Sequence, residues 1–198
     1  MIEFKNLSNE EPYIIFKTKY LDAINAGQTR IEAISISTYN KEKNEVDSRF
    51  VNLKFVDGEQ FIFFSNYNSP KSIAFNSHDQ ISALIYWAST DVQIRMKAKI
   101  KKTSIKYNKE YFKSRSYDKN ALAISSNQSN VINSYDDIRQ QYDKTSIQKD
   151  LSKCPTYWGG FSFVPYYFEF WEGHKSRINK RLVLNKVDEK WKQFILEP

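Results

Sequence analysis

An alternating aromatic segment that breaks at a glycine constrains the fold of this chain more than any other feature. Residues 168–172 read Phe-Glu-Phe-Trp-Glu, which has the period of two that is typical of a strand, and Gly173 interrupts it. After the glycine, Arg177, Asn179 and Arg181 occupy every second position. In a continuing strand these three side chains would share one face. The segment therefore predicts two neighbouring strands of a sheet.

The two arginines of this pattern predict an anion site or a solvated strand. Two guanidinium groups on one face repel each other unless an anionic or carbonyl-rich group covers them. Their planar forks suit phosphate oxygens and the acceptors at a ring edge. Spacing alone favours a solvated basic strand, because short motifs have low specificity. The choice between the two readings depends on the rest of the chain.

The remaining sequence predicts one mainly β domain of the α+β class over residues 1–198. No linker rich in Gly, Ser or Pro divides the 198 residues. The expected strands cover residues 31–38, 48–56, 60–65, 81–87, 92–102, 161–171, 177–186 and 191–196. The expected helices cover residues 12–26, 70–76, a region around 107–112, 121–125 and 135–151. About eight strands with a few helices indicate a barrel or sandwich with peripheral helices.

Charge and cysteine content restrict the partners and the compartment. The net charge of +7 favours an anionic partner, which could be nucleic acid, a membrane surface or a phosphorylated small molecule. Basic and acidic residues are interspersed, so we expect no nucleic-acid partner. The start of the chain has no long apolar run, which argues against a signal peptide or membrane span. The single cysteine, Cys154, permits no disulfide and fits a cytoplasmic protein, and we expect no metal site.

Two segments near the middle of the chain carry candidate phosphate ligands. Arg49 and Lys54 lie in one predicted strand, where strict alternation puts them on opposite faces. They can serve one ligand only if the strand bulges or the ligand wraps around its end. Ser65 and Lys71 flank the passage from a strand into a helix, where hydroxyls, free N–H groups and an ammonium can bind phosphate.

A later helical region offers a second set of candidates. Tyr111 and Arg115 are four residues apart and would share a helix face, which Lys119 continues if the helix persists past Ser116. This row suits a phosphate ester, and an exposed helix face would show the same spacing. Gln128-Ser129 offers amide and hydroxyl groups that suit the polar edge of a ring, although such residues are also ordinary turn formers.

Reactive side chains are scarce in this sequence. It has no Gly-rich phosphate loop, no GxSxG motif and no usable Ser/His or Cys/His pairing. An enzyme with many cations and few reactive groups is expected to bind a cofactor that performs the chemistry.

Taken in order, these segments resemble the pyridoxamine 5′-phosphate oxidase family of FMN enzymes. The matching motifs are Arg49-Phe50-Val51-Asn52-Leu53-Lys54 (R-x-V-x-L-K), Phe63-Phe64-Ser65-Asn66 (F-Y-T-N), Ser69-Pro70-Lys71 (S-R-K), Tyr111-Phe112-Lys113-Ser114-Arg115 (Y-F-x-S-R), Gln128-Ser129 (Q-S), Trp158-Gly159-Gly160-Phe161 (W-G-G-F) and Glu169-Phe170-Trp171 through Arg181. Gln93 falls where the family keeps a flavin-contacting glutamine. The likeness extends from about Pro12 to Pro198.

This resemblance implies an FMN-binding split β-barrel that forms a homodimer, with FMN at the subunit interface. The implied FMN contacts are Arg49, Lys54, Phe64, Ser65, Lys71, Gln93, Gln128, Ser129, Trp171 and Arg181. The implied contacts to a phosphorylated substrate are Lys54, Tyr111, Arg115, Lys119, Arg177 and Asn179. Arg177 and Asn179 would act at the reacting ring. The implied activity is oxidation of pyridoxamine or pyridoxine 5′-phosphate to pyridoxal 5′-phosphate by oxygen.

The chain departs from the family pattern at several of these positions. Asn179 replaces a histidine, and an amide hydrogen-bonds but carries no proton. Pro70 replaces an arginine, Phe64 a tyrosine and Lys119 a serine, and the ammonium of Lys119 can also bind phosphate. Asn179 and Pro70 leave open an FMN protein that acts on a different small molecule. The charge of +7 leaves open a binding protein for flavin, pyridoxal phosphate or nucleic acid without catalytic activity.

Overall fold

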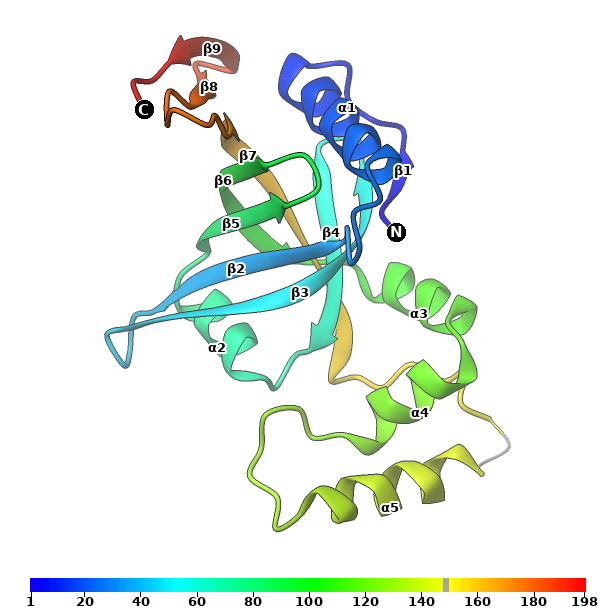
Figure 1. The fold of residues 1–198 in the computed structure, drawn as a ribbon. Helices are drawn as coiled ribbons and strands as arrows, with labels where there is room; N and C mark the ends of the chain where they lie inside the picture. The colour runs from blue at the N-terminus through cyan, green and yellow to red at the C-terminus, as the bar shows by residue number, and fades with distance from the viewer. Residues whose placement is uncertain (148–149) are drawn as a thin grey trace.

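The computed structural model describes residues 1–147 and 150–198, and it shows an α+β fold dominated by one sheet (Figure 1). The nine strands in these residues are β1 (Glu3–Lys5), β2 (Ala33–Asn40), β3 (Glu45–Asp57), β4 (Gln60–Asn66), β5 (Gln80–Trp87), β6 (Val92–Lys102), β7 (Trp158–Glu172), β8 (Lys180–Val187) and β9 (Lys190–Ile195). The helices are α1 (Glu11–Asn25), α2 (Pro70–Ser77), α3 (Ile105–Ser114), α4 (Tyr117–Ser125) and α5 (Tyr135–Ser146). None of them, within the described residues, is long and apolar enough to cross a lipid bilayer.

Strand pairing closes a ring. The order β3-β2-β5-β6-β7 is joined at its ends by β4, which pairs with both β7 and β3. All of these pairs are antiparallel, whereas β1 adds to β3 in parallel. The predicted mainly β, α+β class is confirmed.

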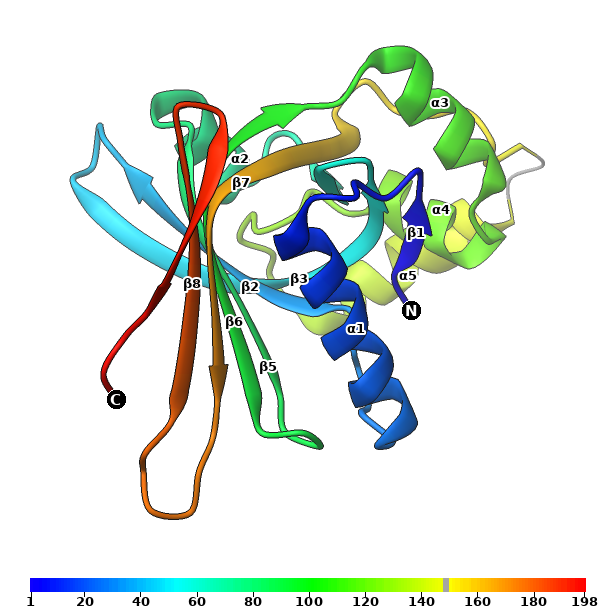
Figure 2. The ribbon, with the colours of Figure 1, turned by 90° about the horizontal axis from the view of Figure 1, so that it is seen from above.

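The ring is not a regular barrel, because strand β7 has two partners along one edge. Its first half pairs with β4 over 158–163, and its second half pairs with β8 over 167–172. Pro165, which has no backbone N–H to donate, lies between the two halves. On the opposite edge, the register with β6 shifts between Lys97 and Ala98. Strands β8 and β9 therefore leave the ring as a separate ribbon (Figure 2).

Aromatic side chains fill the ring. Phe61 and Phe163 stack with ring centroids 5.3 Å apart, and Phe63 and Phe161 form the next stacked pair at 5.6 Å. Helix α1 contributes Phe16, whose ring meets the edge of Phe61 at 5.0 Å. All five rings are 0–1% exposed. Burial of each ring stabilises the fold by about 1.5–3 kcal/mol, so this stack anchors the strands that carry polar residues on their outer faces.

Most of the predicted elements are confirmed with shifts of a few residues, two predictions need correction and one strand was missed. The strand expected at 177–186 begins at Lys180, because residues before it form a loop in which Arg177 has φ +59°. The helix expected at 135–151 ends at Ser146, and residues 148–149 lie outside the described residues. Strand β1 was not predicted, because three residues carry too short a pattern.

A buried polar network attaches α3 to the ring. Asn108, which is 4% exposed, accepts a hydrogen bond from the Gly160 backbone N–H through Oδ1 (2.9 Å). Its Nδ2 donates to the hydroxyl of Tyr67 (2.9 Å), which in turn donates to the Gly160 carbonyl (3.1 Å). Thr103 Oγ1 donates to Asn108 Oδ1 (2.5 Å). Because the polar groups of Asn108, Tyr67, Thr103 and Gly160 hydrogen-bond to one another, the network fixes the direction in which α3 leaves the sheet.

Gly160→Ala tests this close packing. A Cβ at Gly160 would lie 2.5 Å from Thr103 Oγ1 and 3.1 Å from Phe64 Cε1. We expect the substitution to lower the free energy of unfolding by roughly 1–3 kcal/mol, measured by urea denaturation. In a Thr103→Ala background the same substitution should cost less, because Oγ1 of Thr103, the nearest colliding atom, is gone. Equal costs in both backgrounds would contradict the proposed collision.

Candidate functional site

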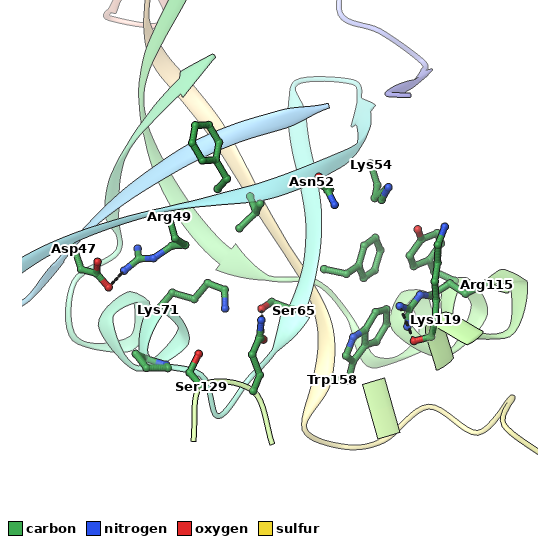
Figure 3. A pocket seen from close by; sticks show the side chains of 16 residues that line it. Asp47, Arg49, Asn52, Lys54, Ser65, Lys71, Arg115, Lys119, Ser129 and Trp158 are labelled. Atoms are coloured by element: carbon green, nitrogen blue, oxygen red, sulfur yellow. Dashed lines mark hydrogen bonds and ion pairs between the residues drawn. The ribbon is translucent and has the colours of Figure 1, made fainter. Parts of the chain in front are cut away.

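A cavity of about 610 Å³ lies where the ring meets α2 and the α3–α4 region (Figure 3). Its size is that of a small-molecule site. It is lined by residues of β3, β4, α2, the α3–α4 region, the loop after α4 and the start of β7: Asp47, Arg49, Phe50, Val51, Asn52, Lys54, Phe64, Ser65, Pro70, Lys71, Tyr111, Arg115, Lys119, Gln128, Ser129 and Trp158. Segments far apart in the sequence thus meet at one place.

The cavity is strongly cationic. The described residues that line it include five cations, namely Arg49, Lys54, Lys71, Arg115 and Lys119. They include one carboxylate, that of Asp47. In Figure 3 these cations form two groups, with Arg49 and Lys71 on one side and Lys54, Arg115 and Lys119 on the other. Separated cation groups suit a ligand, or a pair of ligands, with anionic groups at both ends.

Three backbone and side-chain acceptors hold Arg49 at the first group. Its Nη1 donates to the carbonyl of Ile36 (3.1 Å) and to Thr38 Oγ1 (2.8 Å), and its Nη2 pairs with Asp47. The side chain therefore has a fixed direction before any ligand arrives.

Lys71 is the most deeply buried cation of the cavity, with 8% of its surface exposed. Its Nζ donates to Ser69 Oγ at the start of α2 (2.9 Å). Burial and, to a smaller extent, the nearby charge of Arg49 together lower the pKa of Lys71 to about 8. The negative charge of an anion placed between the two cations would offset their repulsion and raise the pKa of Lys71 again, so this place suits an anion.

The loop after α4 reaches the same side of the cavity. Gln128 accepts through Oε1 from Ser65 Oγ (3.1 Å) and from the backbone N–H of Asn66 (3.2 Å). Because Oε1 is occupied, the Nε2 donors of Gln128 are the groups left for a ligand. Ser129 follows with φ +70°, which turns the loop at the cavity wall.

The second cation group surrounds an incompletely satisfied arginine. Arg115 Cζ lies 4.4 Å from the ring centre of Trp158, and Nη2 donates to the Lys119 carbonyl (3.1 Å). Its Nη1 is buried and has no hydrogen-bond partner among the residues that the structure describes. The pKa of Lys54 is lowered by burial and, among the nearby charges, by Lys119 and Arg115. A buried donor surrounded by like charges is the arrangement that a bound anion would stabilise.

A stack of aromatic rings forms the wall beside this second group. Phe64 stacks against Tyr111 with centroids 3.9 Å apart and against Trp158 with centroids 5.2 Å apart. The wall offers flat apolar surface beside the cations. A flat ring carrying an anionic group would match both features.

A bulge explains how Arg49 and Lys54 reach one cavity. The register between β3 and β4 shifts between Leu53 and Phe55, so Lys54 is the extra residue. This shift breaks the alternation that would have put the two cations on opposite faces. The sequence-based condition that the strand must bulge is therefore met.

Helix α3 ends earlier than the row of Tyr111, Arg115 and Lys119 suggested. Arg115 is the C-cap residue of α3, with ψ 156°, and Lys119 belongs to the separate helix α4. All three residues nevertheless line the cavity, because the chain turns sharply at Arg115 and Ser116. The three side chains converge although the helix does not persist past Ser116, which was the condition for Lys119 to continue the row on one helix.

Five of the predicted site residues are absent from the cavity lining: Gln93, Trp171, Arg177, Asn179 and Arg181. Gln93, Trp171 and Arg181 are direct cross-strand neighbours on β6, β7 and β8. They form a second cluster, here called the β6–β8 cluster.

A buried glutamate organises the β6–β8 cluster. Glu169, which is 2% exposed, accepts from Arg181 Nε (2.9 Å) and from the hydroxyl of Tyr167 (3.0 Å), and it pairs with Arg95. Burial alone would raise the pKa of Glu169, but these hydrogen bonds and the two arginine charges hold it below its usual value. Glu169 thus orients Arg181, a role that the sequence analysis missed. The available signal was a lone carboxylate between Phe168 and Phe170 in an otherwise aromatic strand.

Arg177 and Asn179 do not share a strand face with Arg181, contrary to the sequence-based expectation. They lie in the loop between β7 and β8, and Arg177 is exposed. The left-handed backbone of Arg177 breaks the period of two.

Comparison with known proteins identifies relatives that span nearly the whole chain. The chain is 34% identical to the pyridoxine/pyridoxamine 5′-phosphate oxidase of Christiangramia forsetii over 193 residues, which is 96% of this chain and 89% of the relative. It is 32% identical to the protein of the same name from Colwellia psychrerythraea, over 96% of this chain and 88% of the relative. Residues 158–198 match the family model of the pyridoxine 5′-phosphate oxidase C-terminal dimerisation region.

Two solved structures share the fold. PhzG from Burkholderia lata, in complex with tetrahydrophenazine-1-carboxylic acid, superposes with a TM-score of 0.90 at 22% identity, over 95% of this chain and 93% of that one. A pyridoxamine 5′-phosphate oxidase-related, FMN-binding protein from Nostoc punctiforme gives a TM-score of 0.78 at 13% identity, over 96% and 99%.

The titration of Lys71 tests the electrostatics of the cavity. In the protein without ligand, Lys71 should lose its proton near pH 8, as followed by NMR of ¹³C-labelled lysine side chains. Arg49→Gln should raise this pKa, because it removes a neighbouring positive charge but leaves Lys71 buried. Anion binding beside Lys71 should weaken as the pH rises through this value, since the ammonium is then neutral. A titration at the ordinary value of a solvated lysine would contradict the proposed site.

Proposed function

The chain belongs to the pyridoxine/pyridoxamine 5′-phosphate oxidase family, and from this premise we propose that it is an FMN-dependent oxidoreductase that oxidises pyridoxamine or pyridoxine 5′-phosphate to pyridoxal 5′-phosphate with oxygen. The observation that carries the proposal is one cavity with two cation groups and an aromatic wall. We place the protein in the cytoplasm, as one FMN-binding split-barrel domain over residues 1–198.

The residues of the first cation group fit the phosphate of FMN. Arg49 has a fixed orientation, and Lys71 is buried with a lowered pKa that an anion would restore. Ser65, Gln128 and Ser129 add hydroxyl and amide donors on the same side. FMN itself is a flat ring system with a phosphate, which matches the shape and charge of the cavity.

The residues of the second cation group fit the phosphate of the substrate. The unpartnered Nη1 of Arg115 supplies a donor, and Lys54, Lys119 and the Tyr111 hydroxyl can complete the set. Lys119, which stands where the family has a serine, adds a full charge to this place. A phosphate monoester, with close to two negative charges at neutral pH, offsets more of this repulsion than a carboxylate does.

The proposed reaction needs little from protein acids and bases. Pyridoxamine 5′-phosphate, oxygen and water give pyridoxal 5′-phosphate, ammonia and hydrogen peroxide. When bound, FMN supplies the chemistry of accepting two electrons from the substrate and passing them to oxygen. The residues of this chain bind both phosphates and so fix the two rings relative to each other, and Phe64 and Trp158 exclude water from one side.

We propose that two copies of the chain build each site. Trp158 and Trp171 lie thirteen residues apart on β7, which corresponds to as much as about 40 Å along an extended strand. At this separation, one FMN molecule does not extend from the cavity at Trp158 to the β6–β8 cluster of the same copy. A homodimer in which that cluster, and the loop with Arg177, closes the cavity of the second copy brings all the predicted contacts together. The family match of residues 158–198 to a dimerisation region supports this arrangement.

A second candidate function rests on the departures from the family pattern. Asn179 cannot carry a proton, and Pro70 removes an arginine beside Lys71. These changes favour an FMN protein that acts on a different small molecule, or a flavin-binding protein without catalytic activity.

Anaerobic mixing tests the proposed reaction. We expect FMN-loaded protein to lose its oxidised-flavin absorbance when pyridoxamine 5′-phosphate is added, because the substrate reduces the flavin. Admission of oxygen should restore the absorbance, with one aldehyde formed per turnover. Dephosphorylated pyridoxamine is the matched control and should react far more slowly. A yellow protein that never bleaches would overturn the proposed substrate and favour the second candidate.

Complementation between two inactive variants tests the shared site. Arg115→Ala should lose substrate binding and Arg181→Ala should weaken FMN binding, so each variant alone should be nearly inactive. When the two are co-expressed in equal amounts, half of the dimers are mixed and each mixed dimer has one intact site of two. The expected activity is therefore about a quarter of wild type. No gain over the separate variants would show that each site lies within one copy.

A further inference from the structure

We propose that Asn179 is a positioning residue that holds the loop of residues 173–179 in the conformation that presents Arg177. The proposal rests on the proposed function for its consequence in catalysis, but the loop itself can be tested without any ligand. The side chain of Asn179 stands at the end of the loop, directly before β8. Its Oδ1 accepts a hydrogen bond from the backbone N–H of His174 at the other end (3.0 Å).

His174 is the centre of the loop's internal hydrogen bonds. Its carbonyl accepts from the backbone N–H of Arg177 (2.8 Å), and its Nδ1 accepts from the backbone N–H of Ser176 (3.1 Å). The bond from His174 to Asn179 therefore links this turn to the start of β8. Without it, the turn would be joined to the strands only through the chain.

The other end of the loop is attached to the turn between β5 and β6. The backbone N–H of Gly173 donates to the carbonyl of Asp91 (2.9 Å). Gly173 packs so closely on the Asp91 carboxylate that any Cβ would collide with it. That carboxylate also accepts from the hydroxyl of Tyr86 (2.9 Å). Two independent contacts, at Gly173 and at His174, thus fix the base of the loop.

This attachment holds a conformation that the backbone of Arg177 does not favour. Its φ of +59° lies in the left-handed region, which residues other than glycine adopt only when their surroundings require it. The exposed Arg177 side chain has no hydrogen bond or ion pair among the described residues. The loop is strained and held at its base, and the guanidinium of Arg177 is free. This side chain is therefore positioned to bind a group outside its own copy of the chain.

The side-chain oxygen of Asn179 is thus engaged in a hydrogen bond within the protein. A direct role on the substrate as a hydrogen-bond donor would have to use its Nδ2. This difference gives a test, because aspartate keeps an acceptor at the same place and has no such donor, whereas alanine has neither.

The first measurement is amide hydrogen exchange of the protein without substrate. Asn179→Ala should increase the exchange rate of the His174 amide by roughly three- to tenfold, and Asn179→Asp should restore most of the protection. Unchanged exchange in Asn179→Ala would contradict the proposal that Asn179 holds the loop, whatever the protein's substrate proves to be.

The second measurement is steady-state kinetics with pyridoxamine 5′-phosphate. Asn179→Ala should raise KM roughly three- to tenfold with little change in the Kd of FMN, and Asn179→Asp should recover most of the loss. In an Arg177→Ala background, Asn179→Ala should have no further effect on KM, because Asn179 acts by positioning Arg177. Additive effects, or an aspartate variant as defective as alanine, would show that Asn179 acts on the substrate directly. If exchange is altered but neither wild type nor any variant turns over the substrate, the role of Asn179 in holding the loop is supported. The proposed function is then contradicted.

Discussion

The division of one edge of β7 between two partners is the constraint on which the rest of the structure depends. The first half of β7 closes the ring through β4, and the second half starts the ribbon of β8 and β9. Trp158, at one end, lines the cavity, while Trp171, near the other, belongs to the β6–β8 cluster. One strand therefore carries parts of two half-sites and separates them by its own length. Association of two copies follows from this geometry if both halves serve one ligand.

Period-two and capping patterns predicted the regular part of the fold because local sequence determines it. Strand β6 was predicted with its observed bounds, since apolar and polar residues alternate without a break from Val92 to Lys101. The start of β8 was predicted wrongly for a physical reason. Residues from Arg177 onward alternate as in a strand, but the contacts of His174 and Asp91 hold Arg177 in a left-handed turn. The contact between Gly173 and Asp91 joins segments far apart in the sequence, and the hydrogen bonds of His174 lie within an irregular loop, so no periodic pattern shows either of them.

The candidate site was predicted to a similar extent. The cations Arg49, Lys71 and Arg115 were predicted to be phosphate ligands, and the structure brings them into one cavity. Their convergence depends on the bulge at Lys54 and on the sharp turn after α3, both of which are tertiary features. Glu169 was missed because its role appears only when β6 and β8 bring Arg95 and Arg181 to its two oxygens. Sequence identifies the kinds of groups, and the strand register determines which of them meet.

The electrostatics of the cavity also bear on stability. Burial and, after it, the nearby cations lower the pKa of Lys71 and Lys54, which means that the charged forms are disfavoured in the folded protein without ligand. For a lysine with a lowered pKa, the folded state gains stability relative to the unfolded state as the pH rises above the folded pKa, because the unfolded chain binds more protons there. An anion that fills the cavity raises the pKa again and removes this dependence. The same charges that weaken the empty protein at neutral pH therefore strengthen ligand binding, so the stability of this fold and the occupancy of its site are coupled.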